Sequence, residues 1–154
     1  MELKRRQARE WAIQMLTAAD LNPCDDIDGF IEGYFRQLAS RDAEDDGIAC
    51  RIPTFLREMS ESRVRGVLER RDELDSRLQP LLENWDLARL GTVERAVLRL
   101  GAWEILYSDV PPPVVINEAV DLVNWYSSPK SRALVNGVLD KLAHNSQVQE
   151  GQTT

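Results

Sequence analysis

Four basic side chains stand close together near the start of the chain: Lys4, Arg5, Arg6 and Arg9. Guanidinium groups bind phosphate through two parallel hydrogen bonds, so this cluster has the chemistry of a phosphate-binding surface. Arg5 and Arg9 are four residues apart, which places them on one face of a helix. A solvated charged face is the ordinary explanation of such a cluster and stays open. Cations at a helix N-terminus oppose the helix dipole, and this small penalty weakly favours a functional reason for them.

A second group of binding residues lies near position 130, where aromatic, hydroxyl and cationic side chains occur in one short stretch. It comprises Trp125, Tyr126, Lys130, Ser131 and Arg132. Single-stranded RNA is bound by aromatic rings on which its bases stack and by cations that contact its phosphates. The group is therefore a candidate surface for an unpaired strand. The alternative is that Trp125 or Tyr126 covers the hydrophobic core.

No residue pattern predicts catalysis, a cofactor or a metal ion. The chain has neither a Walker-type phosphate loop nor a dinucleotide-binding glycine turn. Its single histidine, His144, is interpreted as a surface residue near the end of the last helix. Cys24 and Cys50 form no C-x-x-C pair and cannot complete a zinc site with one histidine. The acidic segments around Gly29 and Gly47 both lack the bidentate carboxylate that closes a calcium loop. Because no pattern of catalytic residues is found, the sequence predicts a binding protein and not an enzyme.

The net charge of −7 is unevenly distributed along the chain. Residues 1–14 carry four basic and two acidic side chains, whereas residues 15–50 carry two basic and nine acidic ones. A polyanion responds to the surface within a Debye length of about 8–10 Å, so a local basic patch is compatible with an acidic protein. The charged N-terminus lacks the apolar core of a signal peptide, and no apolar run of about 18 residues occurs. We therefore expect a cytoplasmic protein.

Apolar residues recur with helical spacing along almost the whole chain, and no strand-like alternation of useful length occurs. In the N-terminal half we expect a helix that Leu21-Asn22-Pro23 stops, a second helix along Ile27–Leu38, and an acidic loop at Ser40–Cys50. A third helix should have Pro53 in its first turn, and its apolar pattern continues until Pro80 kinks or ends it.

In the C-terminal half, Thr92 is predicted to cap a helix that is apolar around most of its circumference and therefore lies at the centre of a bundle. Pro113 is expected at the first position of the next helix, and Ser128-Pro129 at the start of the last one.

These expectations define the fold class as all-α, a compact bundle of about seven helices in two lobes. The loop at Ser40–Cys50 or the turn near Trp85–Gly91 would divide the lobes. Residues 1–145 would form the helical domain, and residues 146–154 a polar C-terminal tail.

Three sequence runs in the C-terminal half resemble the NusB transcription antitermination family in their order and spacing. They are Glu94-Arg95-Ala96-Val97-Leu98-Arg99, the Pro-x-x-Ile-Asn-Glu-Ala run of Pro113–Ala119, and Val135-Asn136-Gly137-Val138-Leu139-Asp140-Lys141. The resemblance implies an all-helical protein of two lobes that pairs with the ribosomal protein NusE. The pair would bind the boxA element of nascent single-stranded RNA and, with other Nus factors, make RNA polymerase resist termination on ribosomal RNA operons.

The resemblance also implies roles for individual residues. The arginine-rich first helix of the family matches Arg5, Arg6 and Arg9, and its central-helix arginine matches Arg99. Its RNA-facing segment before the last helix matches Tyr126–Arg132.

The surface for NusE would include Glu94, Arg95 and Val114. Two family motifs are interpreted as structural: Asn117 should hydrogen-bond a neighbouring helix or turn, and Asn136-Gly137 should permit close helix approach. The departures from the family pattern leave the RNA sequence preference open; they are Thr17, Lys130 and Leu134.

Two other functions stay open on the sequence alone. A protein–protein helical adaptor without RNA binding is compatible with the acidic segment 15–50. A module related to the RNA-binding domains of ribosomal RNA cytosine methyltransferases is the other alternative. A homodimer that hides the RNA surface is a further arrangement that the sequence allows.

Overall fold

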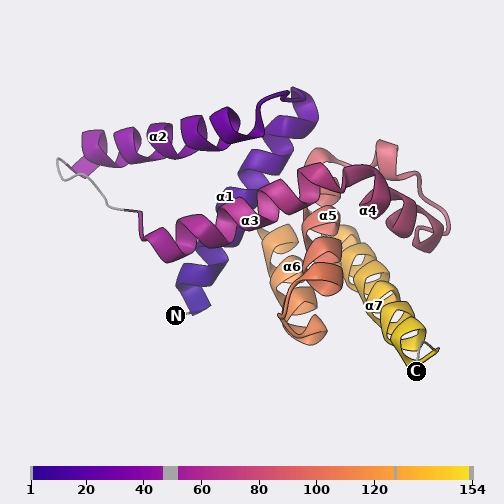
Figure 1. Ribbon diagram of the computed structural model, residues 1–154. Helices are drawn as coiled ribbons and strands as arrows, with labels where there is room; N and C mark the ends of the chain where they lie inside the picture. The colour runs from indigo at the N-terminus through magenta and orange to yellow at the C-terminus, as the bar shows by residue number, and fades with distance from the viewer. Residues whose placement is uncertain (1, 47–51, 127, 153–154) are drawn as a thin grey trace. The chain divides into compact units, whose positions relative to one another are not determined.

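The computed structural model describes residues 2–46, 52–126 and 128–152, with side chains described for residues 5–41, 52–125 and 128–147. These residues form seven α-helices, two short 3-10 helices and no strand, which confirms the predicted all-α class (Figure 1). The elements are α1 (Glu2–Leu21), α2 (Ile27–Asp46), α3 (Thr54–Glu69), α4 (Arg71–Leu78), η1 (Gln79–Leu81), η2 (Leu87–Arg89), α5 (Thr92–Tyr107), α6 (Pro112–Tyr126) and α7 (Pro129–Gln152).

The chain divides into two compact units, Met1–Arg65 and Gly66–Thr154. The predicted division at Ser40–Cys50 or Trp85–Gly91 is therefore wrong, because the boundary falls inside α3. The physical reason is that one helix serves two cores. In the first part of α3, Arg57 pairs with Glu32 of α2. The C-terminal part of α3, from Gly66, belongs to the unit that contains α5.

The first unit contains α1, α2 and most of α3, with α2 and α3 running in opposite directions (Figure 1). The apolar stripe predicted for α1 is buried throughout: Ala8, Ala12, Met15, Leu16 and Ala19. Trp11 of α1 meets the ring of Phe35 of α2 edge to face, with 5.7 Å between the ring centroids. Such perpendicular aromatic pairs fix the relative orientation of the two helices within this unit.

The second unit is built around α5, which packs against α4, α6 and α7. Its buried residues lie on several sides of the helix, as the sequence predicted for a central helix. Gly101 permits close approach, since a Cβ there would lie 2.7 Å from Cδ1 of Leu139 on α7. Gly137 has open space where its Cβ would be, so the prediction that Asn136-Gly137 allows helix approach is wrong. Asn117 is exposed, so burial does not require it to hydrogen-bond a neighbouring helix.

Two helix starts differ from their predicted positions by one residue. The cap of α5 is Gly91 and not Thr92, and α6 begins at Pro112 and not Pro113. Ser128-Pro129 begins α7 as predicted, with the Ser128 carbonyl accepting the Ser131 amide at 3.0 Å. In both missed cases, two adjacent residues are suited to a helix N-terminus, and the sequence does not distinguish between them.

Three larger differences concern helix length. Helix α2 continues to Asp46 through the first part of the expected loop, because residues 40–46 contain neither glycine nor proline; residues 47–50 lie outside the described ones. Helix α3 is separated from α4 at Arg70. The Arg70 amide donates to the carbonyl of Gly66 at the end of α3, and the Arg70 carbonyl accepts the amide of Leu74 at the start of α4. Helix α7 extends to Gln152, through most of the expected polar tail.

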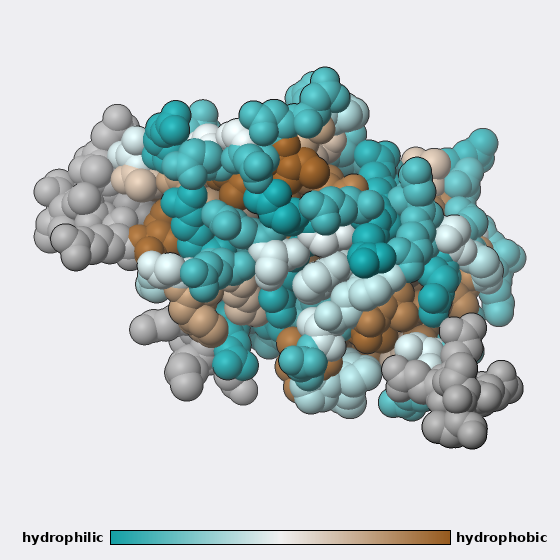
Figure 2. Space-filling view, in the orientation of Figure 1, coloured by the Kyte–Doolittle hydropathy of each residue, from teal (hydrophilic) through white to brown (hydrophobic). Residues whose placement is uncertain are grey.

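Hydrophilic residues cover much of the face shown in Figure 2, with apolar residues exposed between them. Across the described helices, none combines the length and hydropathy that a membrane span requires. Within the same residues, no group of three or more histidine, cysteine and acidic side chains is arranged to hold a metal ion.

Candidate nucleic-acid interface

The basic cluster of the N-terminus lies on α1, in the first unit, but its members are not equally accessible. Arg5 is exposed and Arg6 is half-buried, whereas Arg9 is only 4% exposed. Arg9 lies four residues before Ile13 and seven before Leu16, both buried, so it follows a buried line of the helix. The prediction that Arg5 and Arg9 present one accessible face is therefore wrong. The side chain of Lys4 lies outside the described ones.

Arg5 faces an aromatic ring that the sequence interpretation did not include. Its guanidinium carbon lies 5.9 Å from the centroid of the Phe55 ring, which is within the range of a cation–π contact. Phe55 precedes the buried Leu56 and falls outside the apolar stripe of α3, so its ring is exposed. The sequence signal that could have identified Phe55 is a large aromatic residue at a position outside the apolar stripe of its helix.

The second group of binding residues lies in the second unit, where α6 ends and α7 begins. The side chain of Trp125 is 76% exposed, so the alternative in which it covers the core is wrong. Lys130 is exposed and Arg132 is half-buried at the start of α7. The Tyr126 side chain lies outside the described ones. The described members thus combine an open indole face with two cations, as expected for a single-strand surface.

Ser131 joins this group to a residue predicted to contact a partner. Its hydroxyl donates a hydrogen bond to Oε1 of Glu94, on the first turn of α5, at 3.0 Å. The hydrogen bond places a carboxylate beside the cations of the α7 start. An anion there lowers the local positive potential and so weakens attraction for phosphate.

The other two residues predicted to contact a partner differ in environment. Arg95 donates to the carbonyl oxygens of Ala88, at 3.0 Å, and Leu90, so its guanidinium supports the turn before α5. Val114 is exposed at the start of α6 and has no such structural task. Of the two, Val114 is the better candidate for a contact surface.

Arg99, the predicted central-helix arginine, is buried in an ion pair. Its Nε and Nη2 atoms donate to the two carboxylate oxygens of Asp75 on α4, at 2.8 and 3.0 Å. The Arg99 side chain is 9% exposed. A guanidinium that is committed to a bidentate carboxylate and shielded from water is not presented to phosphate. We therefore assign Arg99 to the packing of α4 against α5 and not to an RNA surface.

A further charged cluster lies where α3 meets α4. The Arg70 guanidinium stacks 4.2 Å from the centroid of the Tyr107 ring and donates to Glu73 at 3.1 Å, and the Tyr107 hydroxyl also donates to Glu73. The hydrogen bond from Tyr107, and then that from Arg70, lowers the pKa of Glu73. The hydrogen bond to Glu73 raises the pKa of Tyr107.

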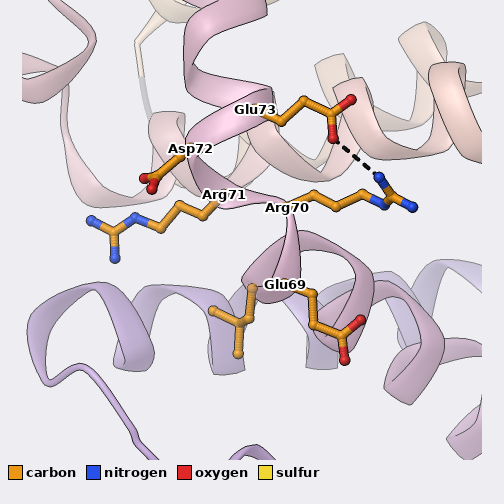
Figure 3. Close-up of a pocket in the computed structure, with 6 residues that line it drawn as sticks. Glu69, Arg70, Arg71, Asp72 and Glu73 are labelled. Atoms are coloured by element: carbon orange, nitrogen blue, oxygen red, sulfur yellow. Dashed lines mark hydrogen bonds and ion pairs between the residues drawn. The ribbon is translucent and has the colours of Figure 1, made fainter.

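Figure 3 shows Arg70 and Glu73 directed toward one another at this corner, beside a cavity of about 420 Å³. The cavity is lined by Leu68, Glu69, Arg70, Arg71, Asp72 and Glu73. Both cations and carboxylates line it, so no single sign of charge selects a ligand. We interpret the cluster as a structural link between α4 and α5.

Comparison with known proteins adds a family and a set of related folds. The NusB family model matches residues 6–144. Transcription antitermination protein NusB of a Nitratiruptor species is 38% identical over 140 residues, which are 90% of this chain and 91% of that protein. The protein of the same name from an Anaeromyxobacter species is 38% identical over 143 residues, covering 93% of this chain and 92% of that protein.

Solved structures agree with this assignment. T. maritima NusB superimposes with a TM-score of 0.75 at 27% identity, covering 91% of this chain and 90% of that chain. A chain in the crystal structure of antitermination factors NusB and NusE in complex with dsRNA superimposes with a TM-score of 0.73 at 28% identity, covering 94% of this chain and 99% of that chain.

Proposed function

The chain belongs to the NusB family, and we propose from this membership that it is a transcription antitermination factor. It acts as a cytoplasmic, non-enzymatic adaptor that pairs with the ribosomal protein NusE and binds the boxA element of nascent ribosomal RNA transcripts. Through that complex it acts indirectly on RNA polymerase. The observation that carries the proposal is the family match over residues 6–144, which spans nearly all of both units.

The accessible cations and the open indole define the proposed RNA-binding residues. In the first unit they include Arg5 and Arg6, and in the second Trp125, Lys130 and Arg132. Lys4, Tyr126 and Ser131 stay in the set on their sequence positions, whereas Arg9 and Arg99 leave it because they are buried. Each group is proposed as an RNA contact in its own right, within its own unit.

The test is fluorescence anisotropy with a boxA-containing oligoribonucleotide, a scrambled strand and a duplex, each with and without NusE. We expect preference for the single boxA strand and tighter binding with NusE. A single strand contributes a slope of about −0.7 per phosphate contact, so the five proposed cations, which are Lys4, Arg5, Arg6, Lys130 and Arg132, predict a slope of log affinity against log salt of about −3.5. Equal affinity for boxA and scrambled strands would refute the proposal.

Lysine variants on α7 supply a matched control within this assay. Lys130→Ala should reduce the slope by about 0.7, because it removes one phosphate contact. Lys141→Ala should leave the slope unchanged, since Lys141 is also exposed on α7 but pairs with Glu83 at 3.3 Å, outside the proposed RNA-binding residues. An equal effect of the two changes would show that general charge, and not the start of α7, governs binding.

The two alternatives make different predictions in the same experiment. A protein–protein adaptor would bind NusE, but the complex would bind RNA no more tightly than NusE alone. A methyltransferase module is disfavoured because the antitermination proteins named above match over 91% and 92% of their own lengths. RNA selection that depends on NusE is therefore the result that separates the proposal from a protein–protein adaptor.

A further inference from the structure

The first unit contains two arginine–phenylalanine pairs with opposite surroundings. In one, the Arg57 guanidinium lies 4.9 Å from the ring centroid of Phe35, which is buried. Arg57 also pairs with Glu32 at 2.6 Å and with Glu61 at 2.9 Å. The charge of Arg57 is thus paired with carboxylates and the Phe35 ring is covered, so neither is offered to a ligand. The hydrogen bond to Glu61 raises the pKa of Arg57.

The other pair is open. The Phe55 ring is 56% exposed, and the Arg5 guanidinium carbon lies 5.9 Å from its centroid. Among the side chains that the structure describes, no carboxylate pairs with Arg5. An exposed ring beside a cation that no described acid neutralises has the two elements that single-stranded RNA requires, a stacking surface and a phosphate contact.

We propose that Phe55 and Arg5 form a binding site for one nucleotide of single-stranded RNA. The base stacks on the exposed face of the Phe55 ring, and the Arg5 guanidinium hydrogen-bonds the adjoining phosphate. An unpaired base is required, because bases inside a duplex are already stacked and do not offer a free face. The inference rests on the proposed function and adds a stacking residue to its RNA contacts.

The site lies wholly within the first unit, on α1 and the first turn of α3. It therefore needs no contribution from the residues around Trp125. An acidic neighbour limits its strength: Glu58 is exposed on α3, three residues after Phe55 and so on the same side of the helix. Repulsion between Glu58 and the phosphate should keep the affinity modest.

The central experiment compares Phe55→Leu with Trp85→Leu in the full chain bound to NusE, titrated with boxA RNA. Trp85, in the second unit, is likewise 56% exposed, so its replacement controls for loss of an exposed aromatic residue. Stacking on an aromatic side chain changes affinity by about fivefold to a hundredfold per base. We expect Phe55→Leu to weaken binding at least about fivefold, Phe55→Trp to retain it, and Trp85→Leu to leave it unchanged.

Two outcomes separate this inference from the proposed function. If the unaltered chain fails to distinguish boxA from a scrambled strand, the proposed function fails. If it selects boxA and Phe55→Leu binds as tightly as the unaltered chain, only the Phe55–Arg5 site is refuted. Far-ultraviolet circular dichroism and the urea midpoint establish that Phe55→Leu folds, as expected for an exposed position.

A double-mutant comparison tests the pairing itself. Arg5→Ala should reduce the salt slope by about 0.7, whereas Phe55→Leu should leave the slope unchanged because it removes no charge. If both side chains bind the same nucleotide, the double variant should lose less affinity than the product of the two single losses. Glu58→Gln should strengthen binding. Independent losses would show that Arg5 and Phe55 act on separate parts of the ligand.

Discussion

Replacing Asp75 by alanine should destabilise the second unit more than replacing Arg99 by methionine, although both changes remove the same ion pair. The Arg99 side chain is 9% exposed and that of Asp75 is 28% exposed. Removing Asp75 therefore leaves a guanidinium that water barely reaches. Removing Arg99 leaves a carboxylate that water can hydrate, and the methionine retains much of the apolar stem.

The size of the difference follows from the burial of the group that stays behind. Loss of one partner from a buried ion pair costs about 3–5 kcal/mol, because the remaining charge loses its bidentate partner in a poorly hydrated site. Asp75 is partly hydrated, so we expect about 3 kcal/mol for Asp75→Ala, at the lower end of that range. For Arg99→Met we expect about 1–2 kcal/mol, and the double variant should cost less than the two single changes together.

Urea unfolding followed by tryptophan fluorescence and circular dichroism measures these differences, provided that the slopes agree between variants. A midpoint for Asp75→Ala equal to or above that for Arg99→Met would refute the reasoning from burial. The same variant tests the structural role of Arg99 in binding. Folded Arg99→Met should retain RNA affinity and salt slope, and a slope reduced by about 0.7 would restore Arg99 to the phosphate contacts.

Two other predictions concern packing and pH. Gly101→Ala should lower the free energy of unfolding by about 1–3 kcal/mol because of the contact with Leu139, whereas Gly137→Ala on α7 should raise it by about 0.5–1 kcal/mol; urea midpoints compare them. Tyr107→Phe should remove a pH-dependent contribution. The lowered pKa of Glu73 makes its contribution present above the ordinary value of 4.5 and lost as pH falls through the folded pKa. The raised pKa of Tyr107 makes its contribution present below 10.0 and lost as pH rises through the folded pKa. The difference in midpoint between wild type and Tyr107→Phe should therefore be largest between about pH 5 and 9, and a constant difference would contradict this.

Helical periodicity was sufficient to predict the elements that form each core. The α1 stripe from Ala8 to Ala19 is buried as expected, and α5 is central because it is apolar on several sides. Proline and serine at helix starts located the beginning of α7, and Pro80 marked where α4 gives way to a 3-10 turn. These signals are local, so they do not depend on how distant parts of the chain pack.

The accessibility of individual cations could not be predicted in the same way. Arg5 and Arg9 look equivalent in the sequence, yet only Arg5 is exposed, because Arg9 follows the buried line of Ile13 and Leu16. The family resemblance matched Arg99 to an RNA-binding arginine, and the sequence shows no sign of its carboxylate partner, because Asp75 lies 24 positions away on another helix. Such pairings depend on tertiary packing, which periodicity within one helix does not specify.

The placement of carboxylates predicts that this protein of net charge −7, if it binds RNA as proposed, does so selectively but weakly when alone. Each proposed cationic group has an acidic neighbour, Glu58 three residues from Phe55 on α3 and Glu94 hydrogen-bonded to Ser131 at the start of α7. These acids reduce non-specific attraction for phosphate, because a neighbouring carboxylate lowers the local positive potential. Selectivity must then come from base stacking and from NusE, and any gain in RNA affinity on adding NusE requires that RNA tighten NusE binding by the same factor.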